Sequence, residues 1–390
     1  MELAIIARPS RILSGHLWVF SNELKESPKR YEPGSILELR DKSGNFLGIG
    51  YVNPHSLISI RVLTRKKEEI NEEFFRARIK DALAYRRRFL TDAGSFRVVY
   101  SESDLLPGLI VDKYEDCLSI QFLTLGMEKW SDCILKILDE VFSPRVIVLR
   151  NDSSARTLEG LPLEKKVVKG SLEKLPVVRD KTSLIEIDPI GGQKTGFFLD
   201  QTENRNAFSA MIGPAGSGLG LDLFCYYGAW SLKMAEKGAT VTGVDSSEEA
   251  LGLARRNAGL NNLSGRCSFV KADVFAFTRD ALSKGLLYDF IVLDPPAFVK
   301  SKAKIKEALR GYRELNASCM SLLKAHGLLA TSSCSHDIAR DTFIEMLGSS
   351  ARDAGKRVRI LEIRSQSKDH PISLAVPETE YLKCLFLEVS

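Results

Sequence analysis

Five chemically active residues stand at or just after short apolar segments in the second half of this sequence: Asp222, Asp245, Asp273, Asp294 and Cys334. Helical patterns separate the apolar segments, and this alternation is typical of an α/β domain with a mainly parallel sheet. In such a sheet the carboxyl ends of the strands meet at one edge, where ligands bind. We therefore expect these side chains to gather around one site.

The segment 219–245 predicts a strand, a turn at Gly228, a helix and a second strand that ends at Asp245. A glycine lets the backbone turn tightly beside a ligand, and an acid at the end of the second strand accepts hydrogen bonds from ribose hydroxyls. A dinucleotide needs several glycines for its pyrophosphate, whereas S-adenosylmethionine (SAM) has no phosphate, so a single glycine favours SAM. Asp273 is placed to accept a hydrogen bond from the adenine amino group. A lone acid at such a position is usually a helix cap, but four acids in this order favour a cofactor site.

Asp294 and Cys334 follow the apolar segments 288–293 and 327–333, and together they could catalyse a covalent methylation. C5 of a pyrimidine is not nucleophilic until a thiolate adds to C6; C5 then accepts a methyl group, and loss of the C5 proton expels the cysteine. An acid that hydrogen-bonds N3 of a cytosine assists the addition, and Asp294 suits this role. A cysteine alone is more often an inert buried thiol, so the hypothesis depends on where Cys334 stands. His336 could tune the thiol, although a surface or capping role is the simpler interpretation.

Residues 294–298, Asp-Pro-Pro-Ala-Phe, also resemble the Asp/Asn-Pro-Pro-aromatic motif of amino-group methyltransferases. There the Asp or Asn and backbone oxygens hold an exocyclic amine while the aromatic ring, here Phe298, stacks on the base. Methylation of guanine or adenine at nitrogen is therefore the alternative reaction. A third hypothesis is an RNA-binding protein that holds SAM without turnover. Lys300 and Lys302 follow the motif, and they either belong to a solvated loop or contact nucleic-acid phosphates.

The chain is expected to have three parts, of which two precede the α/β domain. Short alternating strands over 35–63 predict a β barrel or small sandwich, and a binding module is expected because no catalytic cluster is present. Residues 71–90 have helical spacing and end in three arginines, 86–88, which form either a solvated helix face or a phosphate contact. The polar stretch 151–166 predicts a linker or exposed loop. The boundaries are 1–72, 73–180 and 181–390.

Length and composition fit two or three globular domains, with 390 residues, 44% hydrophobic and 27% charged. The sequence contains no run of eighteen apolar residues, so no membrane span is expected, and its start lacks the features of a signal peptide. Seven scattered cysteines without a Cys-x-x-Cys pair argue against a disulfide framework or a zinc site and favour a reducing cytoplasm. The net charge of +5 tolerates a polyanionic partner.

Several segments together resemble the bacterial 23S ribosomal RNA cytosine-C5 methyltransferase family: 194–205, 222–225, 294–298 and 333–336. Residues 15–20 are similar to the start of that family's N-terminal PUA domain, a small RNA-binding β barrel, and 104–112 are similar to its central α+β domain. The resemblance covers nearly the whole chain. It implies a Rossmann-like SAM-dependent methyltransferase domain after the two smaller domains, with 23S ribosomal RNA as substrate and cytosine as target.

The resemblance supports Cys334 and Asp294 as the catalytic pair. Many related cytosine-C5 enzymes carry a second cysteine directly after Pro-Pro, but this sequence has Ala297 and Phe298 instead, which leaves Cys334 as the nucleophile at this edge. A homodimer is compatible with the sequence, which does not fix the oligomeric state. The expected cofactor contacts are Gln201, Asp222, Phe224, Gly228, Asp245, Asp273 and Asp294. The expected substrate contacts are Phe298, Lys300 and Lys302.

Overall fold

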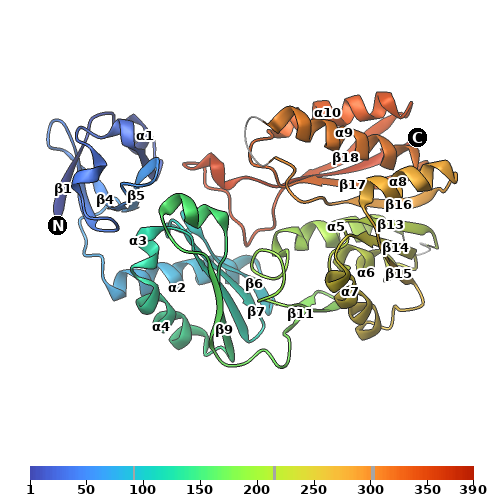
Figure 1. The fold of residues 1–390 in the computed structure, drawn as a ribbon, viewed down its shortest axis with the longest axis horizontal. Helices are drawn as coiled ribbons and strands as arrows, with labels where there is room; N and C mark the ends of the chain where they lie inside the picture. Colours follow the sequence, from blue (N-terminus) through green and yellow to red (C-terminus); the bar gives the residue numbers. More distant parts are fainter. Residues whose placement is uncertain (91–92, 214–216, 300–303) are drawn as a thin grey trace. The chain divides into compact units, whose positions relative to one another are not determined.

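The chain passes back and forth between two units, which are coloured along the sequence in Figure 1. The computed structural model describes residues 1–90, 93–213, 217–299 and 304–390. Unit 1 consists of Met1–Pro176, Asp188–Leu199 and Lys368–Thr379. Unit 2 consists of Val177–Ile187, Asp200–Ser367 and Glu380–Ser390. The expected domain boundaries at 72 and 180 stay a prediction.

The N-terminal part of unit 1 is a five-stranded sheet of order β1-β3-β4-β5-β2, in which only β1 and β3 pair in parallel. Alternate residues of β3, Leu37 and Leu39, are buried and face a core that also receives Val376 from the late segment Lys368–Thr379. The elements are β1 Glu2–Ile6, α1 Ser10–Leu13, β2 Trp18–Phe20, β3 Ile36–Asp41, β4 Phe46–Val52 and β5 Ile58–Thr64.

A second five-stranded sheet, of order β10-β9-β8-β7-β6, follows in unit 1, and the helices α2 and α4 pack against it (Figure 1). The predicted helix begins where the Asn71 side chain accepts a hydrogen bond from the Phe74 amide at 3.1 Å, which is an N-cap. The elements are α2 Glu72–Phe89, β6 Ser95–Tyr100, β7 Leu109–Tyr114, β8 Cys117–Phe122, α3 Leu125–Glu128, α4 Ser131–Phe142, β9 Val146–Asn151 and β10 Glu164–Lys169.

The three arginines that end α2 do not share one environment. Arg86 is 1% exposed; it donates hydrogen bonds to the carbonyls of Arg97 (2.9 Å) and Asp369 (2.8 Å) and pairs with Asp104. The expectation of a solvated face or a phosphate contact is therefore wrong for Arg86, because interior acceptors satisfy its guanidinium. The other two arginines are exposed.

The polar stretch 151–166 is not an exposed loop throughout. Arg156 is buried and pairs with Glu128 at 2.7 Å, and Glu159 is buried and pairs with Arg61 at 2.9 Å. The stretch then enters β10, the edge strand of the second sheet. The prediction is wrong for Arg156, Glu159 and the start of β10, although most of the residues between are exposed. It failed there because charged side chains can be buried when they are paired, and the partners lie far away in the sequence.

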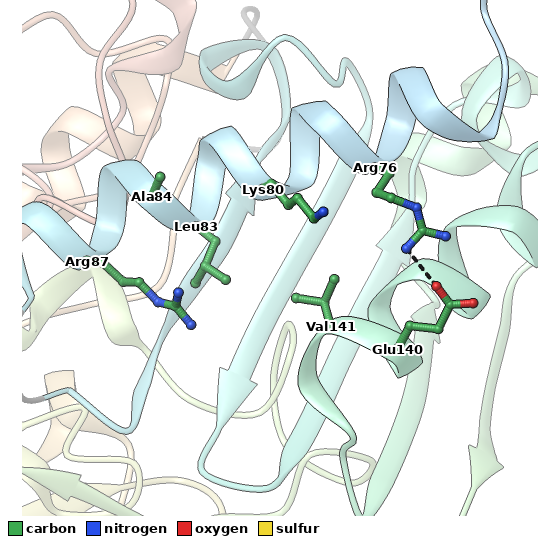
Figure 2. A pocket seen from close by; sticks show the side chains of 7 residues that line it. All are labelled: Arg76, Lys80, Leu83, Ala84, Arg87, Glu140 and Val141. Carbon is green, nitrogen blue, oxygen red and sulfur yellow. Dashed lines mark ion pairs between the residues drawn. The ribbon is translucent and has the colours of Figure 1, made fainter.

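A groove of about 630 Å³ lies beside α2 and α4, and Figure 2 shows its lining side chains. Three cationic residues of α2, Arg76, Lys80 and Arg87, line it together with apolar side chains. Glu140 on α4 pairs with Arg76 at 2.6 Å. Lys80 and Arg87 are exposed, and neither pairs with a carboxylate among the described residues. The groove therefore carries two uncompensated positive charges.

Unit 2 is built on a seven-stranded sheet of order β15-β14-β13-β16-β17-β19-β18. The strands β13 to β17 pair in parallel, whereas β19 is antiparallel to both of its neighbours. One hydrophobic cluster includes residues of α8, α9 and α10, and another includes residues of α5 and α6. The strand order reverses between β13 and β16, and open α/β sheets bind ligands at the carboxyl ends of the strands at such a point.

The two short strands of unit 2 are β11 Val177–Asp180 and β12 Ser183–Glu186. The strands of the large sheet are β13 Leu219–Leu223, β14 Thr240–Asp245, β15 Cys267–Lys271, β16 Tyr288–Leu293, β17 Leu323–Ser333, β18 Val358–Arg364 and β19 Lys383–Val389. The helices are α5 Thr202–Met211, α6 Ala229–Ala235, α7 Glu248–Leu260, α8 Val274–Ser283, α9 Ile305–Ser321 and α10 Arg340–Asp353. No helix in the described part of the chain combines the length and the apolar character needed to cross a membrane.

Candidate active site

The loop between β13 and α6 has a left-handed backbone at three positions. Phe224 and Tyr226 have φ of 64° and 49°, and Gly228 has φ of 79°. This conformation costs a bulky residue roughly 1–3 kcal/mol and is concentrated at ligand sites, where the surrounding structure imposes it. A Cβ atom on Gly228 would also lie 3.0 Å from the ring of Phe269. The predicted glycine turn is present, and its backbone is strained at the carboxyl end of β13.

Asp222 lies in β13 and is fully buried. Its Oδ2 accepts hydrogen bonds from the Ser231 amide (2.9 Å) and hydroxyl (2.6 Å), whereas Oδ1 accepts none from the residues that the structure describes. Burial raises the pKa of Asp222 to about 7, against the opposing effect of the Ser231 hydrogen bonds. Buried polar atoms normally have a partner. The free acceptor at this edge therefore fits a cofactor with a cationic amino group, as SAM has.

Asp245, the last residue of β14, accepts hydrogen bonds from the amides of Tyr226 (3.0 Å) and Ser247 (2.9 Å). Each carboxylate oxygen keeps a lone pair for a further donor such as a ribose hydroxyl. Asp273 is exposed and caps α8, because its Oδ1 accepts from the Ala276 amide at 2.9 Å. The helix-cap interpretation therefore holds for Asp273, and its contact with adenine stays a prediction.

Asp294 directly follows β16 and is held by two donors. Its Oδ1 accepts from Gln201 Nε2 (3.0 Å) and its Oδ2 from Trp230 Nε1 (3.1 Å). Gln201 is buried; it also donates to Ser332 Oγ (3.1 Å) and accepts from Asn204 (2.7 Å), so its side-chain amide is engaged in the protein's own network. Its expected contact with the cofactor stays a prediction. Burial raises the pKa of Asp294 to about 6, and the Trp230 hydrogen bond opposes that shift.

Cys334 directly follows β17, the parallel neighbour of β16. Its half-buried thiol lies 3.9 Å from the carbonyl oxygen of Pro295, so the structure brings Cys334 and the segment that begins with Asp294 to the same edge of the sheet. His336 is exposed, and its ring packs against Tyr381 with 5.4 Å between centroids. This position agrees with the simpler interpretation of His336 as a surface residue.

Phe298 belongs to an aromatic cluster. Its ring centroid lies 4.6 Å from that of Tyr312 and 6.2 Å from those of Phe224 and Phe275. Phe224, an expected cofactor contact, therefore packs toward Phe298, an expected substrate contact. Both roles stay predictions. The two lysines expected to contact substrate, Lys300 and Lys302, lie outside the described residues.

Three residues of the site were not identified from the sequence: Trp230, Ser332 and Tyr312. Trp230 is the second residue of α6, the helix that follows β13 and the glycine turn. Its place at the start of that helix is a signal in the sequence that could have identified it. The polar residues 331–333 at the end of the apolar strand β17 are a second signal. Tyr312 hydrogen-bonds the hydroxyls of Ser333 and Ser335, both at 3.1 Å, and no local pattern on α9 reveals this contact.

Comparison with known proteins agrees with this arrangement. Residues 8–65 match the model of a PUA-like domain, and residues 220–372 match the model of a methyltransferase domain. The chain is 38% identical, over all of both chains, to the ribosomal RNA large subunit methyltransferase I of Shewanella amazonensis. It is 37% identical to the protein of that name from Pseudoalteromonas translucida, over 96% of this chain and 95% of the relative. This chain belongs to the ribosomal RNA large subunit methyltransferase I family.

Solved structures show the same fold for this member of the ribosomal RNA large subunit methyltransferase I family. SMU.776, described as a methyltransferase and solved in complex with SAH, matches all of both chains with a TM-score of 0.85 at 19% identity. The tRNA m1G37 methyltransferase of M. jannaschii has a TM-score of 0.51 at 14% identity, over 85% of this chain and 82% of its own. The expected Rossmann-like, SAM-dependent methyltransferase domain and N-terminal PUA-like domain are confirmed. A shared fold does not decide which atom is methylated.

Proposed function

We propose that this family member forms 5-methylcytosine in large-subunit ribosomal RNA. The names of the full-length relatives and the PUA-like match support RNA as the substrate. The observation that carries the choice of C5 is the position of Cys334, whose thiol lies 3.9 Å from the Pro295 carbonyl, next to Asp294. A ribosomal RNA substrate also agrees with the cytoplasmic location expected from the seven cysteines.

In the proposed mechanism Cys334 is the nucleophile. Its thiolate adds to C6 of the cytosine and forms a carbon–sulfur bond while N3 receives a proton. The chemistry supplied by bound SAM is an electrophilic methyl group, which C5 accepts. A base then removes the C5 proton, the double bond between C5 and C6 re-forms, N3 returns its proton, and Cys334 leaves as a thiolate.

Asp294 is the proposed proton donor to N3. Because burial raises the pKa of Asp294 to about 6, a fraction of this carboxyl group carries a proton near neutral pH and can deliver it. Gln201 and Trp230 each bond one carboxyl oxygen and so fix the direction of the donor. Asp222, Asp245 and the loop 224–228 are the residues that would hold SAM.

The decisive experiment replaces Cys334 with alanine. Cys334→Ala should abolish methylation of unmodified ribosomal RNA while SAM still binds, because no other group supplies the C6 bond. RNA that carries 5-fluorocytosine should trap the wild-type enzyme as a denaturation-resistant adduct after methyl transfer, since fluorine cannot leave as a proton. Cys267→Ala, at a half-buried cysteine that begins β15, is the matched control and should retain activity.

The same experiment distinguishes the alternatives. Methylation at an exocyclic amine of guanine or adenine needs no thiol, so Cys334→Ala would remain active, and nucleoside analysis would show an N-methylated base. Tight SAM binding without methylation of any ribosomal RNA by the wild-type protein would indicate a binding protein. A folded Cys334→Ala enzyme with near wild-type activity and no fluorinated adduct would exclude the C5 reaction.

A further inference from the structure

Lys383 places a buried ammonium group beside the proposed nucleophile. It is the first residue of β19 and pairs in the antiparallel register with Ser333, the residue before Cys334. Its side chain is only 4% exposed. The cation therefore lies inside unit 2, at the strand end from which Cys334 projects.

The hydrogen-bond partners of Lys383 are neutral. Its Nζ donates to the carbonyls of Ser335 (2.6 Å) and Tyr381 (2.8 Å), and no carboxylate of the described residues lies within ion-pair distance. Lys233, an equally buried lysine on α6, differs because Glu236 lies 3.5 Å from its Nζ. Burying an ammonium group is costly unless a negative charge compensates it.

Cys334 is the group that can supply this negative charge. Burial lowers the pKa of Lys383 to about 8, and the negative charge of a Cys334 thiolate opposes that shift. An interaction between two charges is reciprocal, so an ammonium that is stabilised by a thiolate also stabilises the thiolate. The other charged groups near Lys383 are Glu380 and Arg340, which pair with each other and so largely cancel.

We propose that Lys383 is a positioning residue that holds Cys334 in its thiolate form for attack on the pyrimidine. The use of this thiolate in catalysis rests on the proposed function. The charge interaction between Lys383 and Cys334 exists whether or not RNA is bound. The thiolate is the reactive form of cysteine, so this interaction raises the fraction of enzyme ready to react. The Tyr312 hydroxyl and the His336 ring also lie at this strand end, and Asp294 is linked to Ser332 of β17 through Gln201. All of these groups are unchanged in the variants below.

The test measures alkylation of Cys334 by iodoacetamide against pH, in the full-length protein without RNA or SAM, with peptide mass spectrometry to separate the seven cysteines. In the wild type the midpoint of reactivity should lie clearly below about 8.5, the ordinary value for a free cysteine. Lys383→Met should slow alkylation of Cys334 at pH 7 by roughly tenfold, which corresponds to about one pKa unit. Lys383→Arg keeps the cation and should restore most of the rate.

Lys233→Met is the matched control, because it removes an equally buried lysine elsewhere in unit 2 and should leave Cys334 alkylation unchanged. Wild-type and Lys383→Met proteins that alkylate Cys334 with the same pH profile would overturn the proposal. If Lys383→Met does not fold, the wild-type profile decides, because a midpoint at or above about 8.5 contradicts a stabilised thiolate.

The proposal and the proposed function fail in different ways. If Cys334→Ala remains active but Lys383→Met slows alkylation, the stabilised thiolate stands and the C5 reaction falls. If the fluorinated adduct forms but Cys334 is alkylated equally fast in the wild type and in Lys383→Met, the C5 reaction stands and this role of Lys383 is excluded. If the C5 reaction and the role of Lys383 are both correct, Lys383→Met should lose more of its kcat/KM for RNA at pH 7 than at pH 9. At pH 9 the Cys334 thiol ionises even without the nearby ammonium group.

Discussion

At the scale of single residues, Asp222 is a carboxyl group whose surroundings favour its protonated form. Its pKa is raised from 3.8 to about 7 in the folded chain, so the ionised form destabilises the fold at neutral pH. Because one pKa unit corresponds to about 1.4 kcal/mol, this cost reaches roughly 4 kcal/mol above pH 7 and vanishes below about pH 4. Without SAM, the free energy of unfolding should therefore fall as the pH rises from 4 to 7.

Asp222→Asn should remove much of this pH dependence, because the amide cannot ionise and its oxygen can still accept from Ser231. We expect similar stabilities of wild type and variant near pH 4 and a more stable variant at pH 8, measured by urea unfolding. The control Asp280→Asn, at an exposed acid on α8, should leave the free energy of unfolding unchanged both near pH 4 and at pH 8. A difference between Asp222→Asn and wild type that is the same at both pH values would contradict the argument.

Asp245 and Asp273 should respond differently to the same substitution. Asp245→Ala removes the expected ribose acceptor and should weaken SAM binding by roughly 1–3 kcal/mol, the scale of a lost hydrogen bond to a charged group.

Asp273→Ala removes the cap of α8 and should lower the free energy of unfolding by about 1 kcal/mol. Calorimetry with SAM and thermal unfolding check the two effects. Unchanged SAM affinity in a folded Asp245→Ala protein would remove this residue from the site.

The placement of Asp294 and Cys334 at strand ends could be predicted from the sequence because it depends on local order, whereas their catalytic roles stay predictions. Asp294 and Cys334 each follow a strand directly, and strand ends can be predicted from apolar runs. The donors that hold Asp294 could not be predicted, because Gln201 and Trp230 reach it from α5 and α6 regions distant in the sequence. Lys383 is hidden for the same reason, since only the register of β19 with β17 places it near Cys334.

At the scale of elements, α2 offers a test of the open question about its arginines. Lys80 and Arg87 stand two turns apart on the groove shown in Figure 2, and both carry uncompensated charge. If they contact RNA phosphates, Lys80→Glu with Arg87→Glu should weaken RNA binding and lower the slope of log affinity against log salt by about 2. SAM affinity should stay unchanged.

The matched control reverses two exposed cations on α8 and directly after it, Arg279→Glu with Lys284→Glu, and should leave RNA affinity nearly unchanged. Equal salt slopes for the wild type and the α2 variant would favour a purely solvated helix face. Arg86 is not part of this test, because its substitution would break a buried network instead of a surface contact.

Among the elements, helices and strands with regular apolar spacing were predicted well, whereas the stretch 151–166 was not. Its polar residues look like a loop, yet Arg156 and Glu159 are buried because Glu128 and Arg61 neutralise them. The sequence periodicity reports how apolar side chains are arranged. It carries no information about which charged residue will meet a distant partner.

At the scale of the whole molecule, unit 1 depends on residues from the end of the chain. The Asp369 carboxylate accepts from the Arg97 amide (2.9 Å) and its carbonyl accepts from Arg86 (2.8 Å). The fragment Met1–Pro176 should therefore unfold at a lower temperature than unit 1 in the full chain, because Arg86 loses a buried acceptor and a buried donor left without its partner costs roughly 1–3 kcal/mol.

Circular dichroism on heating measures this difference. Asp369→Ala in the full chain should reproduce part of the loss, since it removes the contact to the Arg97 amide but keeps the backbone carbonyl. A fragment Met1–Pro176 that melts as cooperatively and at the same temperature as unit 1 in the full chain would show that the late segment is dispensable for stability.

The interleaved chain also sets the order in which this protein can be made. During translation the two sheets of unit 1 leave the ribosome first, but the segment Lys368–Thr379, which supplies Val376 and Asp369 to their interiors, emerges close to the C-terminus. The last strand of unit 2, β19, follows directly after it. Neither unit can reach its final form before this late part of the chain has been made, so both must be completed almost together. A pause or truncation late in synthesis would therefore leave two incomplete units instead of one finished and one missing.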